Sequence, residues 1–221
     1  MEEYKLKKKI LVLAALICGL AIISYGTYAF YQYSDTAHNI ITTNGITVKV
    51  EEWMDDGNGE LVEFPKDSIV IMPGATVSKI VTVRNIDADA FLRCRYECYV
   101  VDKNGDKMEL TPEQIREIMI IDENPISEEY PEGAYTKLDD GWFYYNTALK
   151  KNEVTAPLFT KVYFPPEVLT NEFQNAKLII DIEVGAVQVT NNADSVFDAE
   201  GWPIETDAQE TNDGVGNDVA P

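Results

Sequence analysis

The sequence predicts an all-β protein: an antiparallel β-sandwich of the jelly-roll type with short helical insertions. Two features lead to this prediction. Apolar and polar residues alternate over several segments, most regularly at 91–101 and 176–189, and this period of two is typical of strands that bury one face. Asn, Gly and Pro residues stand at the ends of these segments. About seven to eight strands separated by such turns favour a sandwich.

Each expected element has its own signal. Thr111 can cap a helix, Pro112 suits its first turn and Gln114 completes a capping box, so a short helix is expected to begin there. Acidic residues with Pro and Gly fill 122–140, which predicts a long surface loop. A second short helix is expected at 168–174. The expected strands are 46–51, 68–72, 77–84, 91–101, 141–146, 155–164 and 176–189.

Composition divides the chain of 221 residues into four parts. We expect a signal peptide at 1–29, an extended N-terminal arm at 30–45, and a sandwich domain at 46–190 that carries the helix and loop as an insertion at 111–140. The residues of 191–221 are mostly Asn, Asp, Glu, Gly and Thr. Because this composition buries little apolar surface, it predicts an acidic and mostly disordered tail.

The N-terminus has the pattern of an export signal. Lysines precede an apolar run at 10–23, and the small residues Thr27 and Ala29 follow it, which predicts cleavage between Ala29 and Phe30. As a helix of about 14 residues the run spans about 21 Å, less than the roughly 30 Å of a hydrocarbon core. Including Phe30 and Tyr31 brings it to about 20 residues, so a retained membrane anchor is the alternative. Both interpretations predict a secreted or cell-surface protein that contacts the membrane only through an uncleaved signal.

Charge and cysteine content narrow the choice of partners. The formal net charge of −20 argues against binding to nucleic acid or to anionic membranes. Cys94 and Cys98 lie about 13 Å apart along a strand, which is too far for a disulfide, so both are expected to be small buried hydrophobic residues. Arg93 and Arg95 share the opposite face of that strand, which predicts a solvated surface.

The sequence contains no recognised catalytic or cofactor-binding motif. His38 is its one histidine, and the usual patterns for zinc, for a serine nucleophile and for a phosphate loop are absent. We therefore expect no enzyme activity, no metal and no cofactor. The aromatic segment from Trp142 to Tyr145 is interpreted as a core strand. The alternative is a sugar platform, with Trp142 and Tyr144 as the candidate ligand face.

Several segments resemble one known family in their order along the chain. They are the signal exit 26–30, the continuation 37–46, the strand–corner–strand 81–85 and 91–93, the aromatic strand 141–145 and the closing segment 186–188. With these segments the chain is similar, over most of residues 5–190, to the TasA/camelysin family of exported proteins from Gram-positive bacteria. In that family a dedicated signal peptidase removes the signal. The resemblance implies a jelly-roll matrix protein that assembles into extracellular biofilm fibres. The protease activity described for camelysin is not carried over, because the sequence has no zinc motif.

The function expected from the sequence is self-assembly. Removal of the signal would release a strand-forming arm that contains Phe30, Tyr31, Tyr33, Ile40 and Ile41. The resemblance implies that this arm completes the sheet of a neighbouring copy, and strand addition of this kind satisfies backbone hydrogen bonds. The expected partners are other copies of the chain, other matrix proteins, and a signal peptidase during export. The alternative function is a monomeric cell-surface binding module, an adhesin or a glycan binder, on the same scaffold.

Overall fold

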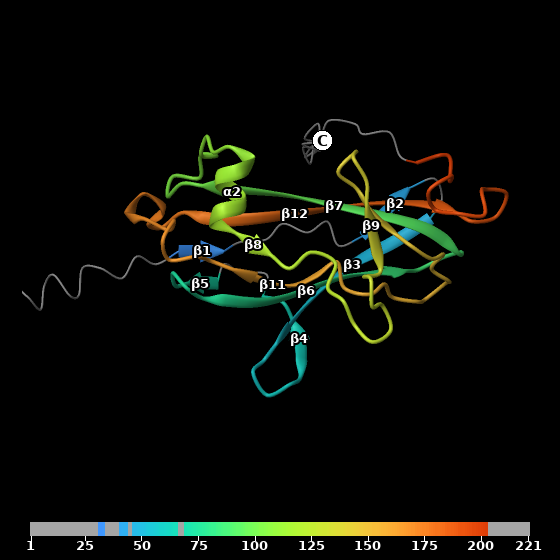
Figure 1. Ribbon diagram of the computed structural model, residues 1–221, viewed down its shortest axis with the longest axis horizontal. Helices are drawn as coiled ribbons and strands as arrows, with labels where there is room; N and C mark the ends of the chain where they lie inside the picture. The colour runs from blue at the N-terminus through green and yellow to red at the C-terminus, as the bar shows by residue number, and fades with distance from the viewer. Residues whose placement is uncertain (1–30, 34–39, 44–45, 66–68, 203–221) are drawn as a thin grey trace, which may run out of the picture.

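Two β-sheets pack face to face in the computed structural model, which describes residues 31–33, 40–43, 46–65 and 69–202 (Figure 1). The strand order in the first, sheet A, is β5 (Ile69–Ile71), β1 (Tyr31–Tyr33), β12 (Lys177–Gln188), β7 (Ala90–Val101), β10 (Phe143–Tyr145) and β9 (Tyr135–Lys137). The order in the second, sheet B, is β2 (Ile40–Thr43), β3 (Ile46–Asp55), β6 (Thr76–Asn85), β11 (Phe159–Tyr163) and β8 (Ile120–Ile121), while β4 (Leu61–Glu63) pairs with β3. The expected all-β sandwich is thereby confirmed.

The long antiparallel pair of β7 and β12 forms the centre of sheet A. Its paired positions run from Lys177 opposite Val101 to Gln188 opposite Ala90. Successive side chains of a strand point to opposite faces of the sheet, so the alternating sequence directs every second residue into the sandwich. Leu92 on β7 is fully buried for this reason.

Sheet B supplies the other half of the core. β6 lies between β3 and β11, and the side chains of Val81, Val83 and Phe159 are at most 1% exposed. They belong to the same hydrophobic cluster as the inner residues of β7 and β12. The two sheets therefore share one core.

The expected helix is present as α2 (Pro112–Ile118), with Thr111 at its N-cap. The backbone N–H of Gln114 donates to Thr111 Oγ1 at 3.3 Å, and the backbone N–H of Thr111 donates to Gln114 Oε1 at 2.8 Å. The second expected helix is a 3-10 turn at Asn171–Phe173. Among the described residues, no helix has the length and apolar content needed to cross a membrane.

The segment 122–140, expected as a surface loop, also contributes β9 to sheet A. Tyr135 pairs with Tyr145 of β10, and its buried ring lies edge-on to that of Tyr145, with 5.1 Å between the ring centres. On the other side of β9, Asn124 Nδ2 donates to the Tyr135 carbonyl and Asn124 Oδ1 accepts from the Tyr135 N–H. One buried ring and one side-chain amide hold this short strand, and neither produces a periodic signal in an acidic segment.

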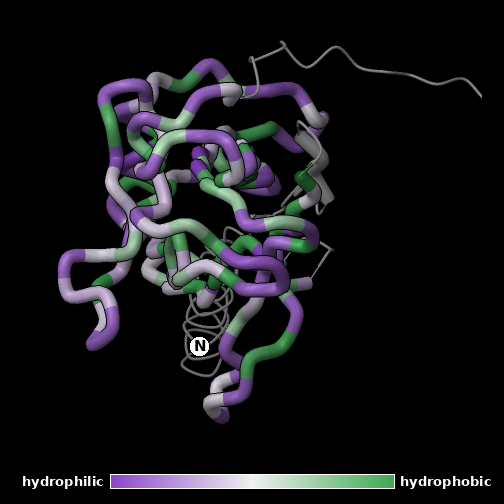
Figure 2. Tube along the Cα trace, turned by 90° about the vertical axis from the view of Figure 1, so that its right-hand side faces the viewer, coloured by the Kyte–Doolittle hydropathy of each residue, from purple (hydrophilic) through white to green (hydrophobic). Residues whose placement is uncertain are grey.

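β3 and β4 form a hairpin that projects from the lower side of the body in both views (Figure 1, Figure 2). In its turn, Asp55 Oδ1 accepts from the Gly57 N–H at 2.7 Å, and Asp56 Oδ1 accepts from the Asn58 N–H at 2.8 Å. All three residues of β4 are exposed. β4 is too short for its alternation to be recognised from the sequence.

A buried ion pair joins β3 to β6 beside this hairpin. Lys79 is fully buried, and its Nζ lies 2.7 Å from Glu52 Oε1 and 4.0 Å from the centre of the Phe64 ring. An ammonium group removed from water loses its hydration, and a nearby carboxylate offsets this loss. The Glu52 carboxylate therefore stabilises the charged form of Lys79 inside the sandwich.

The substitution Glu52→Ala leaves Lys79 buried without this carboxylate. We expect the free energy of unfolding to fall by about 3–5 kcal/mol. The double substitution Glu52→Leu with Lys79→Met removes both charges and should recover most of that loss. Urea unfolding of the three proteins measures the effect, and a loss below about 1 kcal/mol, the size typical of exposed pairs, would contradict this role of the pair.

Candidate functional site

β1 occupies a position between two other strands of sheet A. It runs antiparallel to β5, with Tyr31 opposite Ile71 and Tyr33 opposite Ile69. On its other side it runs parallel to β12, with Tyr33 opposite Leu178. An inner strand directs its backbone N–H and C=O groups to both neighbours. We call this position, between Ile69–Ile71 and the beginning of β12, the β1 slot.

The β1 slot is where sheet A depends on a short strand. Among the described strands, β5 joins the sheet only through β1. Ile71 of β5 is 1% exposed and Leu178 of β12 is fully buried. Removing β1 would therefore open the core at this end of the sandwich and leave two sheet edges to be paired by another strand.

The second strand of the arm, β2, belongs to the other sheet. It pairs antiparallel to β3, from Ile40 opposite Lys49 to Thr43 opposite Ile46, and Ile41 lies within it. Only two residues separate β2 from β3, which is the spacing of a tight hairpin. The sequence predicts an arm that is unpaired until a second copy takes it up, whereas both of its strands are paired within the single chain. The predicted cleavage point, Ala29–Phe30, lies outside the described residues and stays a prediction.

The aromatic segment around β10 directs its rings to both faces of sheet A. Phe143 and Tyr145 belong to the main core. Trp142 and Tyr144 lie in a second hydrophobic cluster on the outer face, where they are 3% and 6% exposed beneath residues 189–202. A sugar platform requires an accessible ring face, so this conformation does not present these two rings to a glycan.

Arg93 is the centre of this outer aromatic cluster. Its guanidinium carbon lies 4.2 Å from the centre of the Trp142 ring and 4.8 Å from that of Trp202, a geometry that favours cation–π attraction. Its Nη1 donates to the Tyr144 hydroxyl at 3.2 Å, and that hydroxyl donates to Asp140 Oδ2 at 2.8 Å. Burial is the main cause that raises the pKa of Tyr144. The expectation of a solvated arginine face is therefore wrong at Arg93, because the chain beyond β12 folds back over it.

Residues 191–202 are part of the folded body, whereas composition placed them in the tail. Val196 is 2% exposed in the outer aromatic cluster. The side-chain amide of Asn192 donates to the carbonyl of Glu200 at 3.0 Å and closes the segment into a loop. A few apolar residues dispersed among polar ones hold it to the sheet. The remaining part of the predicted tail, 203–221, lies outside the described residues.

In the part of the chain that the structure describes, no three His, Cys, Asp or Glu residues come together in a way that could hold a metal ion. Cys94 is fully buried, and burial raises its pKa to about 12. Since the thiolate is the reactive form, Cys94 is inert at neutral pH.

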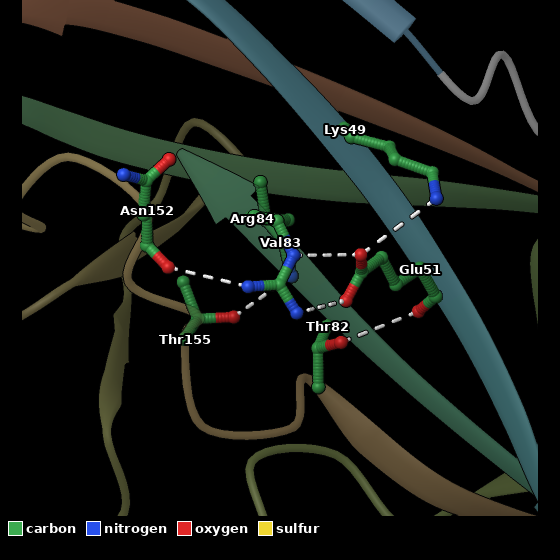
Figure 3. A network of polar contacts seen from close by, with 7 residues as sticks. All are labelled: Lys49, Glu51, Thr82, Val83, Arg84, Asn152 and Thr155. Carbon is green, nitrogen blue, oxygen red and sulfur yellow. Dashed lines mark hydrogen bonds and ion pairs between the residues drawn. The ribbon is translucent and has the colours of Figure 1, made fainter. Parts of the chain in front are cut away.

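The buried carboxylate of Glu51 has a structural role. Arg84 contacts both of its oxygens, Nε to Oε1 at 2.8 Å and Nη2 to Oε2 at 3.0 Å (Figure 3). This hydrogen bonding raises the pKa of the Arg84 guanidinium. Nη1 of the same arginine donates to the carbonyl of Asn152 at 3.2 Å. A general acid or base must reach a substrate proton, whereas Glu51 is engaged by the arginine that ties a loop to sheet B.

Comparisons with known proteins find no relative: no family model, no curated protein and no solved structure matches the chain. The resemblance to the TasA/camelysin family therefore stays a hypothesis based on the segments named in the sequence analysis.

The outer aromatic cluster predicts that Trp202 anchors residues 190–202. The substitution Trp202→Ala removes a cation–π contact and a ring packed edge-on to Tyr144, so docking of the segment should weaken by about 1–2 kcal/mol. Limited proteolysis should then cut the segment about tenfold faster. Phe197→Ala, which truncates a ring that is 49% exposed, is the matched control and should have a smaller effect. Equal cleavage rates for Trp202→Ala and the unaltered chain would contradict this role.

Proposed function

We propose that this chain is an exported structural protein that assembles into extracellular fibres by donating its N-terminal strand to a neighbouring copy. The observation that carries this proposal is the β1 slot: a three-residue strand connects β5 to β12, and nothing in its pairing requires it to come from the same chain. The export signal predicted from the sequence and the family resemblance support the same function.

β1 is the part of the arm that suits exchange between copies. β2 is closed onto β3 by a two-residue connection, so it stays with its own sheet, and Ile40 and Ile41 stay with it. Six residues separate β1 from β2, and an extended chain of that length reaches about 20 Å. A neighbouring copy can therefore receive β1 when its slot lies within about this distance of the donor's β2.

Exchange replaces the pairing within one chain by the same pairing between two chains. The backbone hydrogen bonds gained equal those lost, so concentration and geometry decide which form is populated. A contact in which each copy gives one strand and receives another is heterologous, and such contacts produce open filaments when they do not close into a ring. Export before assembly would restrict filament growth to the outside of the cell.

A truncation tests whether the arm is needed. We expect the mature chain, residues 30–221, to form filaments visible by electron microscopy, and a chain that begins at Ile46 to remain without them. A synthetic peptide of residues 30–43 should bind the shortened chain, because it restores β1 in its slot and β2 beside β3. Filaments of equal length from both chains would contradict the proposal.

A proline substitution tests the backbone pairing itself. Gln32 is the central residue of β1 and lies opposite both Val70 and Lys177. Gln32→Pro removes its N–H, which costs a ladder hydrogen bond, and should reduce the peptide's affinity at least tenfold. Gln32→Ala keeps the N–H and is the control. Titration calorimetry measures both, and equal affinities would exclude strand pairing as the mode of binding.

A further inference from the structure

A groove of about 560 Å³ lies beside β7, between α2 and β9. Its apolar lining includes residues of β7, of the loop before α2, of α2 and its C-cap, and of β10: Tyr96, Met108, Leu110, Ile115, Met119 and Phe143. In Figure 1, α2 and β7, which border the groove, lie on the upper side of the molecule, and the β3–β4 hairpin projects from the lower side. The volume and the apolar lining are typical of a binding site.

The floor of the groove has the geometry of a strand position. β10 pairs with β7 only where Phe143 lies opposite Cys94 and Tyr144 opposite Arg93. Farther along the same side of β7, the Met108 N–H donates to the Val100 carbonyl at 2.8 Å. Backbone groups of alternate residues point to the same side of a strand, so those of Tyr96 point into the groove. An extended segment placed there would continue the line of β10.

The hairpin offers a strand of matching size. β4 pairs with β3 alone among the described strands, and its side chains Leu61 and Val62 are 56% and 41% exposed. Three extended residues occupy about 10 Å, which matches the three residues of β7 from Tyr96 to Cys98. An exposed edge strand with apolar side chains is a template for pairing with another sheet edge.

Charge also favours this pairing over others. Residues 53–63 contain four carboxylates and no Lys or Arg, so two hairpins repel each other. The groove is lined by Lys107, Arg116 and Lys137, whose ion pairs with Glu97, Glu113 and Glu123 measure 2.8, 2.8 and 3.0 Å. These charges sum to zero on a chain of net charge −20. An acidic hairpin therefore approaches this region against less repulsion than a uniformly acidic surface would exert.

We propose that the β3–β4 hairpin of one copy docks in the groove of a second copy, where β4 adds to sheet A beside β7. The hairpin projects from the lower side of the sandwich in Figure 1, whereas α2 and β7, which border the groove, lie on the upper side, so a chain cannot fill its own groove. The contact rests on the proposed self-assembly but uses none of the residues of the arm. Since β1 lies at one end of the body and the hairpin at its long side, this contact joins filaments laterally.

Cross-linking between two variants tests the contact directly. One copy carries Val62→Cys and the other carries Leu110→Cys, both with Cys98→Ala, because Cys98 also lines the groove. A short bismaleimide should join the two variants into a mixed dimer. Replacing the first variant by Ile126→Cys, whose site is 75% exposed and outside the hairpin, is the control. A yield of mixed dimer no higher than in this control would overturn the proposal.

Electron microscopy separates this contact from strand donation. Leu61→Ser with Val62→Ser should leave filaments of the mature chain intact but single, while Ile126→Ser should leave them bundled. Filaments of the double variant that bundle as before would overturn the hairpin contact and leave the proposed function standing. If the unaltered mature chain forms no filaments but the cross-linking experiment yields the mixed dimer, strand donation is rejected and the hairpin contact is supported.

Discussion

Backbone pairing of β1 with β5 and β12 is the constraint on which one end of sheet A depends. β5 has no other strand partner among the described residues, and the buried residues Ile71 and Leu178 lie on either side of β1. Leaving β1 out would open both sheet edges and expose these buried residues, so a strand in the β1 slot stabilises the sandwich. The same pairing does not need that strand to be covalently connected to the same sandwich, and this difference is the physical basis of the proposed polymer.

Self-assembly of this chain must overcome its own charge. Copies with a net charge of −20 repel each other at long range. At physiological ionic strength, salt screens this repulsion beyond about 8–10 Å. Only short-range contacts that bury apolar groups or pair backbone can then hold copies together. The β1 slot provides backbone pairing at one end of the sandwich, and the hairpin and groove provide a second pairing at its sides.

The fold could be predicted because its main strands carry the alternation that one buried face imposes. β7 and β12 follow it over much of their length, and α2 begins at the capping box that Thr111 and Gln114 predict. β4 and β9 were missed because each has only three residues and lies in an acidic segment without a run of apolar residues around it. The partial burial of Arg93 was missed for another reason: it depends on a segment about 100 residues later in the chain, and no local pattern carries such a contact.

The measurement that tests strand donation most directly uses one cysteine in each of two copies. Gln32 and Lys177 lie opposite each other across β1 and β12. Mature chains carrying Gln32→Cys are mixed with chains carrying Lys177→Cys, assembled, and oxidised. Strand donation predicts disulfide-linked dimers that contain one copy of each variant. If no such dimers form, while a single chain carrying both substitutions closes the disulfide within itself, the arm stays in its own sheet and the account is contradicted.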